Sequence, residues 1–173
     1  EFEINDNGTV VFRASVTGST NEGIWANLGS GGALSQIVRE GDEAPGVSEC
    51  AATFASGLSS TSARIVLADS DEIVFQATLE GTCIDTTNDQ GIWRYNPSSG
   101  QLELLLRDSG VYTVDGVDRT LRTFGFLHWI NGSGQQRVVA NGDGRRSGYN
   151  NNRQLAISAV FTDNSQAVLV IGP

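Results

Sequence analysis

The chain has 173 residues, enough for one domain with a sizeable core, and its 39% hydrophobic and 18% charged residues are typical of a globular protein. A formal net charge of −9 argues against an electrostatic grip on nucleic acid. No apolar run approaches the roughly 20 residues that span a bilayer, so no membrane span is expected.

The first predicted repeat, residues 1–46, opens on a polar turn that leads into a β-branched and aromatic strand. Asn7-Gly8 is a favoured two-residue turn of β-hairpins, and Ala44-Pro45-Gly46 ends the regular pattern. The strands expected between these points are 10–16, 24–26 and 34–39.

A connection at 47–63 separates this repeat from a second one at 64–118. The connection is small and polar, with Phe54 and Leu58 as its large apolar anchors, so we expect a long loop or a weak strand. The strands expected in the second repeat are 65–67, 73–79, a strand around Trp93, and 102–107.

Matching landmarks indicate that the second repeat copies the first. The offset between copies grows by five residues, which we assign to the loop that carries Cys83. The matched pairs are Phe12 with Phe75, 63 residues apart, and Trp25 with Trp93 and Arg39 with Arg107, each 68 residues apart.

Residues 119–173 form a closing partial repeat. A strongly apolar strand is predicted at 120–130, and residues 150–157 align with 5–12 at an offset of 145. We expect the repeats to pack into one compact domain, because each unit of a repeat protein buries its apolar face on the next.

The predicted fold is all-β. No stretch shows sustained helical periodicity, and short strands recur between Gly, Asn and Asp turns. Antiparallel repeat modules resembling propeller blades fit the long period best, with a β-sandwich as the alternative. Two to three blades cannot close a ring of ordinary size, so either other copies or further sequence complete it, or the units pack face to face.

The signature of the opening repeat is Asn5, Gly8, Val11 and Phe12, and two further phrases follow at 21–25 and 38–46. This order resembles a group of bacterial secreted proteins with tandem repeats named for an Asn-x-x-Gly-x-x-Ala-Phe signature. Such repeats often precede a PEP-CTERM or similar surface-sorting tail. The resemblance implies export to a cell-surface or extracellular location, and it supplies no catalytic residues.

The later copies depart from that signature. Ala68 and Asp71 replace its Asn and Gly in the second copy, and Arg153 replaces the Gly in the third. Residues 143–150 and 161–167 are also similar to the closing module of the group.

Cys50 and Cys83 are expected to form a disulfide in an oxidising compartment, with two free thiols as the alternative. The bridge would close a loop of about 30 residues and add roughly 3 kcal/mol. With one histidine in the chain, a zinc site would lack ligands. The chain contains no methionine, even at position 1, so we expect a processed form or part of something longer.

No catalytic constellation is predicted. A Ser-His-Asp arrangement would have to use His128, which we interpret as a strand histidine beside packed aromatic residues. A carboxylate pair for glycoside hydrolysis needs convergence across a cleft, and the sequence gives no sign that Glu40, Asp42 and Asp71 converge. We therefore expect no enzyme activity.

No cofactor is expected, with one weak metal candidate. Asp69 and Asp71 lie in an acidic turn that could supply oxygen ligands to Ca²⁺, although it lacks the spacing of an EF-hand loop. A solvated hairpin turn is the simpler interpretation.

Other side chains could bind carbohydrate. Trp25, Trp93 and Trp129 could stack on sugar rings, but equivalent positions in two repeats favour module packing for the first two. Arg145 and Arg146 could bind an anionic polysaccharide or pair with nearby acids. Asn7 and Asn131 begin glycosylation sequons that also make good hairpin turns.

The leading functional hypothesis is a non-catalytic, exported structural module that assembles with copies of itself, another surface protein or a polysaccharide, and that can polymerise into a fibre. The alternatives are a carbohydrate-binding module and a secreted polysaccharide hydrolase.

Overall fold

The computed structural model describes residues 2–18, 22–28, 31–58, 64–127, 129–130, 136–137, 149–150 and 152–172. Within these residues the protein is all-β, as predicted, and its strands pair in antiparallel fashion. No helix among them has the length and apolarity needed to cross a membrane.

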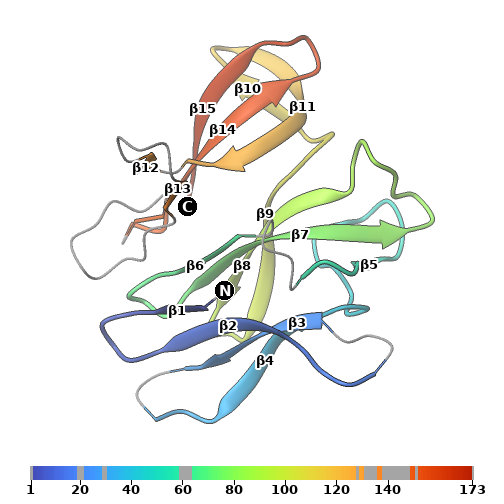
Figure 1. The fold of residues 1–173 in the computed structure, drawn as a ribbon. Helices are drawn as coiled ribbons and strands as arrows, with labels where there is room; N and C mark the ends of the chain where they lie inside the picture. The colour runs from blue at the N-terminus through green and yellow to red at the C-terminus, as the bar shows by residue number, and fades with distance from the viewer. Residues whose placement is uncertain are drawn as a thin grey trace.

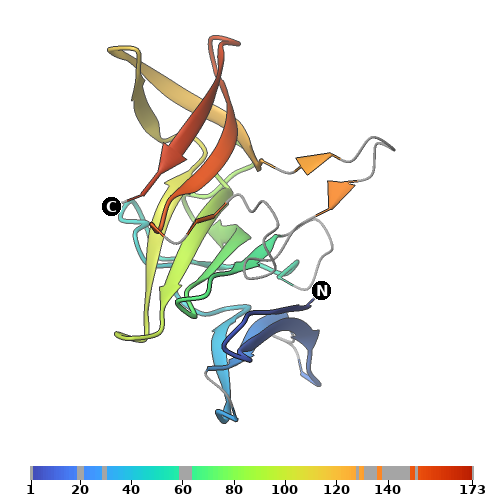
Figure 2. The same cartoon turned by 90° about the vertical axis from the view of Figure 1, so that its left-hand side faces the viewer.

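Three sheets follow one another along the chain and are stacked in the same order in space (Figures 1 and 2). The first sheet contains β1 (Phe2–Ile4), β2 (Val10–Ser15), β3 (Glu22–Asn27) and β4 (Leu34–Arg39), in that spatial order. The central sheet contains β5 (Ala52–Phe54), β7 (Ile73–Gly81), β8 (Gln90–Asn96) and β9 (Gln101–Arg107), with β6 (Ile65–Leu67) also paired to β7. The third sheet contains β10 (Val111–Val114), β11 (Val117–Phe126), β14 (Leu155–Phe161) and β15 (Gln166–Ile171). A short pair, β12 (Trp129–Ile130) and β13 (Gln136–Arg137), stands apart.

The central sheet is buried on both faces. One face contributes Phe75 and Trp93 to a core shared with the first sheet, which supplies Val11 and Ile24. Its other face contributes residues such as Ile92 to a second core, shared with the third sheet. The outer sheets therefore bury one face each and cover the central sheet from opposite sides.

This layering explains the sequence of the strands. β6 and the first half of β7 are continuous apolar runs, because successive side chains point into two different cores. β2 and β14 instead alternate between buried and more exposed positions, as expected for sheets that bury one face.

Details of the strand predictions differ from the structure. The apolar strand predicted at 120–130 is split, with β11 ending at Phe126 and β12 beginning at Trp129. The connection at 47–63, expected to be a long loop or a weak strand, holds the three-residue strand β5, which pairs with the far end of β7. The hairpin partner β10 had no counterpart among the predicted strands, although its Val-Tyr-Thr-Val sequence and the Asp115-Gly116 turn after it are typical of a hairpin.

Candidate interaction face and polar sites

The same aromatic pair is built in the first and central sheets. Phe12 stacks on Trp25 with ring centroids 6.4 Å apart and planes inclined by 24°. Phe75 stacks on Trp93 at 6.3 Å and 21°. In both sheets a β-bulge falls between this tryptophan and the isoleucine before it. The sequence repeat is therefore a repeat of side-chain geometry.

A glycine two residues before each tryptophan makes room for its ring. A Cβ at Gly91 would lie 2.5 Å from the Trp93 ring, and one at Gly23 would lie 2.8 Å from the Trp25 ring. Real Cβ atoms do not approach other atoms so closely, so the indole can fold back over its own strand only where glycine precedes it. The Gly-Ile-Trp phrase is thus a packing motif.

The second aromatic pair is fully covered. Trp93 is inaccessible to solvent, its indole N–H donates to the Pro45 carbonyl at 3.0 Å, and Phe54 meets its ring edge-on at 4.9 Å. Pro45 and Phe54 belong to residues 41–54, the segment after the first sheet, which we call the strap. The Ala-Pro-Gly phrase of one repeat therefore helps to bury the tryptophan of the next.

The first aromatic pair lies on an open face. Phe2, Phe12 and Trp25 are cross-strand neighbours, and Phe2 is 73% exposed. Trp25 is only half-buried, and its indole N–H has no hydrogen-bond partner within the described part of the chain. We call this side of the first sheet the head face; its apolar residues are Phe2, Ile4, Val10, Phe12, Trp25 and Leu34.

The third sheet also has an open face, on the side turned away from the central sheet. Val168 and Val170 lie on it, each 63% exposed, opposite Ser158 and Ala156 of β14. We call this side the tail face; its residues are Ala156, Ser158, Val160, Gln166, Val168 and Val170.

Signature turns join the first two sheets directly. The fourth residue of the turn has a positive φ in every copy, at Gly8 (78°), Asp71 (63°) and Arg153 (62°). The Asn5 side-chain amide donates to the Ala68 carbonyl at 2.9 Å and to Asp71 Oδ1 at 2.6 Å. The turn geometry is therefore kept even where the signature glycine is lost.

The proposed Ca²⁺ turn takes part in these contacts between sheets. The backbone carbonyl of Asp69 accepts from the Asn7 side chain at 2.5 Å, and the Asp71 carboxylate accepts from Asn5. No group of three or more potential metal ligands occurs among the described residues. Asn7, the first sequon asparagine, uses its amide in this contact.

A buried carboxylate links the central and third sheets. Glu72 is 4% exposed, accepts a hydrogen bond from the Tyr149 hydroxyl at 2.9 Å and forms an ion pair with Arg153. Burial raises the pKa of Tyr149, with the hydrogen bond to Glu72 acting in the same direction. Because all of these groups have partners within the fold, they bind one sheet to the next.

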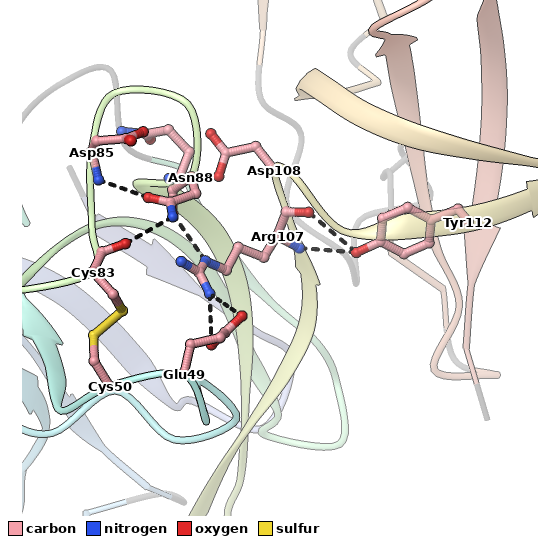
Figure 3. A network of polar contacts seen from close by, with 9 residues as sticks. Glu49, Cys50, Cys83, Asp85, Asn88, Arg107, Asp108 and Tyr112 are labelled. Atoms are coloured by element: carbon pink, nitrogen blue, oxygen red, sulfur yellow. Dashed lines mark hydrogen bonds and ion pairs between the residues drawn. A yellow bond between two sulfur atoms is a disulfide. The ribbon is translucent and has the colours of Figure 1, made fainter.

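Figure 3 shows a network of polar contacts around Arg107. A cavity of about 290 Å³ lies beside this network and is lined in part by Glu49, Arg107 and Tyr112. Arg107 donates from Nη1 to both oxygens of Glu49 at 3.2 Å and from Nε to the Asn88 carbonyl at 2.9 Å. Tyr112 holds the other side of Arg107 by bonding to its backbone. The expected Cys50–Cys83 disulfide is formed next to this network. The network and the disulfide fasten the strap to the central sheet.

The two carboxylates of this region have pKa values shifted in opposite directions. Burial raises the pKa of Asp108 to about 6, whereas a hydrogen bond from its own backbone N–H lowers that of Glu49, helped by Arg107. In Figure 3 the Asp108 carboxylate points away from Glu49. It accepts the backbone N–H of Gln90 at 3.0 Å, so it is not aimed at a shared substrate position.

The first sheet repeats this arrangement. Glu40 Oε2 accepts the backbone N–H of Glu22 at 3.4 Å, at the place where Asp108 accepts that of Gln90. In both repeats, a carboxylate that follows the fourth strand therefore accepts a hydrogen bond from the first residue of the third strand. This recurrence gives the Asp108 shift a structural origin.

The remaining candidate carboxylates are also dispersed. Asp42, in the strap, accepts the backbone N–H of Arg39 at 2.7 Å, whereas Asp71 lies in the turn between β6 and β7. His128, Arg145, Arg146 and Asn131 lie outside the described residues, as does the side chain of Trp129.

Sequence reasoning missed the strap. The signal was present, because Ala-Pro-Gly follows the first repeat at a fixed place, but only the fold brings Pro45 onto Trp93, 48 residues away. It also missed the role of Gly23 and Gly91, although both copies have glycine at the same spacing before tryptophan.

Residues 1–172 match the model of a protein family described as a family of unknown function, DUF7453. No curated protein and no solved structure was found to match the chain.

Proposed function

The chain belongs to the DUF7453 family, and we propose from its own geometry that it is a non-catalytic, exported assembly module of a cell-surface or extracellular structure. Polymerisation into a fibre is one form of such an assembly. The observation that carries the proposal is the repeated Phe–Trp pair, fully covered in the central sheet and only partly covered in the first. Architectures in which each unit buries the face of the next extend by adding units.

Export is supported by the disulfide, because such bridges form and persist mainly in oxidising compartments. The resemblance of the repeat phrases to exported tandem-repeat proteins points the same way. Among the partners considered, copies of the chain or another surface protein would suit the apolar head face best.

A non-catalytic role is supported by how the carboxylates are used. Asp108 and Glu40 accept backbone hydrogen bonds at equivalent places, and Asp71 bonds the turn of another sheet. Because these contacts hold sheets and strands together, we do not favour the polysaccharide hydrolase.

The proposal is tested in the producing cells. Antibodies against the chain should label the outside of intact cells, and native extraction of that material should release the chain in particles much larger than one copy. Labelling only after the cells are opened, or release as single chains without a partner, would refute the proposal.

A carbohydrate-binding module is the second candidate, favoured by one observation. The half-buried Trp25 and the neighbouring Phe12 and Phe2 offer aromatic rings of the kind that stack on sugars. Affinity electrophoresis in polysaccharide gels would test it: retardation of the wild type that Trp25→Ala abolishes, and Val117→Ala keeps, would favour sugar binding. Trp93 cannot take this role because it is buried.

A further inference from the structure

The head face is the register equivalent of a face that is buried inside the molecule. In the central sheet, the residues paired in the same way as Phe2, Phe12 and Trp25 are Ile65, Phe75 and Trp93. All three central residues are inaccessible to solvent, because the first sheet and the strap cover them. The central-sheet equivalent of the head face is thus already an interface between two sheets within the chain.

The tail face has an equivalent partner role. In the first sheet, Val11 lies opposite Ala26, and this side packs onto Phe75 and Trp93. The corresponding cross-strand pair in the third sheet is Ala156 with Val170, which lies on the tail face. The tail face of the third sheet is therefore the register equivalent of the face with which the first sheet covers the central sheet.

Both faces are suited to burial against one another. The head face offers a continuous group of apolar side chains, with Arg39 at its border opposite Gly23, and the six tail-face residues carry no charge. Phe2, Leu34 and Val168 are each more than 60% exposed in the single chain. Each end of the stack therefore exposes apolar side chains that could be buried against the other end, at equivalent strand positions.

We propose that a second copy of this chain stacks its tail face on the head face, so that the copies associate head to tail and continue the order of sheets found within each chain. Such a contact joins two different surfaces, so it produces a ring or an open filament rather than a closed two-fold dimer. The inference rests on the proposed assembly function and specifies which surfaces carry it.

Two variants, each blocking one face, test the proposal. Phe2→Glu/Leu34→Glu places charges on the head face, and Val168→Lys/Val170→Lys places them on the tail face; all four side chains are exposed, so folding should be kept. In sedimentation velocity, the wild type should form dimers and larger species as its concentration rises. Each variant alone should be monomeric, because it lacks one of the two surfaces that the contact requires.

The mixture of the two variants gives the decisive result. The intact tail face of the first variant can bind the intact head face of the second, so the mixture should form a one-to-one dimer that grows no further. A tail-face variant that still dimerises alone, or a mixture that stays monomeric, would overturn the proposal. Val117→Lys, at the tip of the β10–β11 hairpin and 50% exposed, is the control and should associate like the wild type.

The outcomes also separate this inference from the proposed function. If the wild type assembles and the face variants assemble equally well, head-to-tail stacking is wrong while an assembly role stands. If the wild type remains monomeric at every concentration, the stacking proposal fails, and the cell-surface extraction decides the function independently. Circular dichroism and thermal unfolding of each variant establish that loss of association is not loss of fold.

Discussion

At the scale of single residues, the glycine before each tryptophan makes a sharp prediction. Gly91→Ala should destabilise the protein by about 2 to 4 kcal/mol, since the new Cβ would lie 2.5 Å from a ring atom of Trp93, which is fully buried and cannot move aside without disturbing Phe54 and Phe75. Urea unfolding at equilibrium measures the change.

Gly125→Ala is the matched control. Gly125 also lies in a strand, but its Cβ would be in ordinary contact, 3.4 Å from the Ser158 hydroxyl oxygen. A change within about 0.5 kcal/mol is expected there. Equal losses at the two positions would mean that strand glycines matter for a reason other than the tryptophan ring.

Asp108 predicts how stability depends on pH. Burial raises its pKa from 3.8 to about 6, so the folded state holds the proton more tightly than the unfolded state does. The contribution of this group to the free energy of unfolding therefore falls as pH rises from about 4 to 6. Asp108→Asn keeps an oxygen that accepts the Gln90 N–H and removes the titration, so it should stabilise the protein at pH 7 by about 1 to 3 kcal/mol.

Urea unfolding at several pH values compares this variant with the wild type. The difference in free energy of unfolding should grow between pH 4 and 6 and then level off. Asp6→Asn, which removes a charge at an exposed turn, controls for the change in net charge. A constant difference across the range would show that Asp108 does not titrate abnormally in the fold.

At the scale of elements, the strap depends on the disulfide more than on its own burial. Reducing Cys50–Cys83, or replacing both residues by serine, should cost about 3 to 4 kcal/mol for a bridge between residues separated by 33 positions. The loss should be local at first, because Phe54 is the one large, fully buried apolar side chain in the strap.

Hydrogen exchange measures this effect segment by segment. The amides of Gly41, Ala44 and Phe54, which bond within the strap, should exchange faster after reduction. Amides that pair β14 with β15 should keep their rates, since Cys50 packs against the core shared by the first and central sheets and these strands pack against the other core. Uniform acceleration across all sheets would contradict a local role.

The elements themselves were largely predictable, but their partners were not. The alternation of apolar and polar residues in β2 and the continuous apolar runs in β6 and β7 predict the fold class. The equal offset of the tryptophans and of the arginines indicates the repeat. What the sequence does not contain is which sheet covers which. The sequences around Phe12 and Phe75 are alike, yet Phe12 is partly exposed and Phe75 is fully buried, and this difference depends on the order of stacking.

The candidate site shows the same limit. The disulfide partners could be predicted because the chain has two cysteines, and the equivalence of Trp25 and Trp93 because equal offsets relate them and the arginines. The raised pKa of Asp108 and the strap contact through Pro45 could not, since both arise from residues brought together by the packing of separate strands. Periodicity reports local geometry and is silent on long-range burial.

At the scale of the whole molecule, backbone amides in a stack of three sheets should be best protected from hydrogen exchange in the central sheet and less protected in the outer sheets. The central sheet is enclosed by two cores, whereas each outer sheet meets only one. In stacked architectures, stability is a sum of terms for units and for the interfaces between neighbours, so a unit with two interfaces opens least readily. We therefore expect amides of β7 and β8 to exchange most slowly, and those of β2 and β15 to exchange faster, in the isolated chain.

Association should change this order in a defined way. If copies stack head to tail, the first and third sheets each gain a second interface, so exchange in β2, β3, β14 and β15 should slow as the concentration rises, while β7 and β8 change little. Exchange followed by mass spectrometry at low and high concentration, with the tail-face variant Val168→Lys/Val170→Lys as the monomeric reference, measures the difference. Slowing confined to the edge strands β1 and β4 would instead indicate that copies join by pairing strands at their edges.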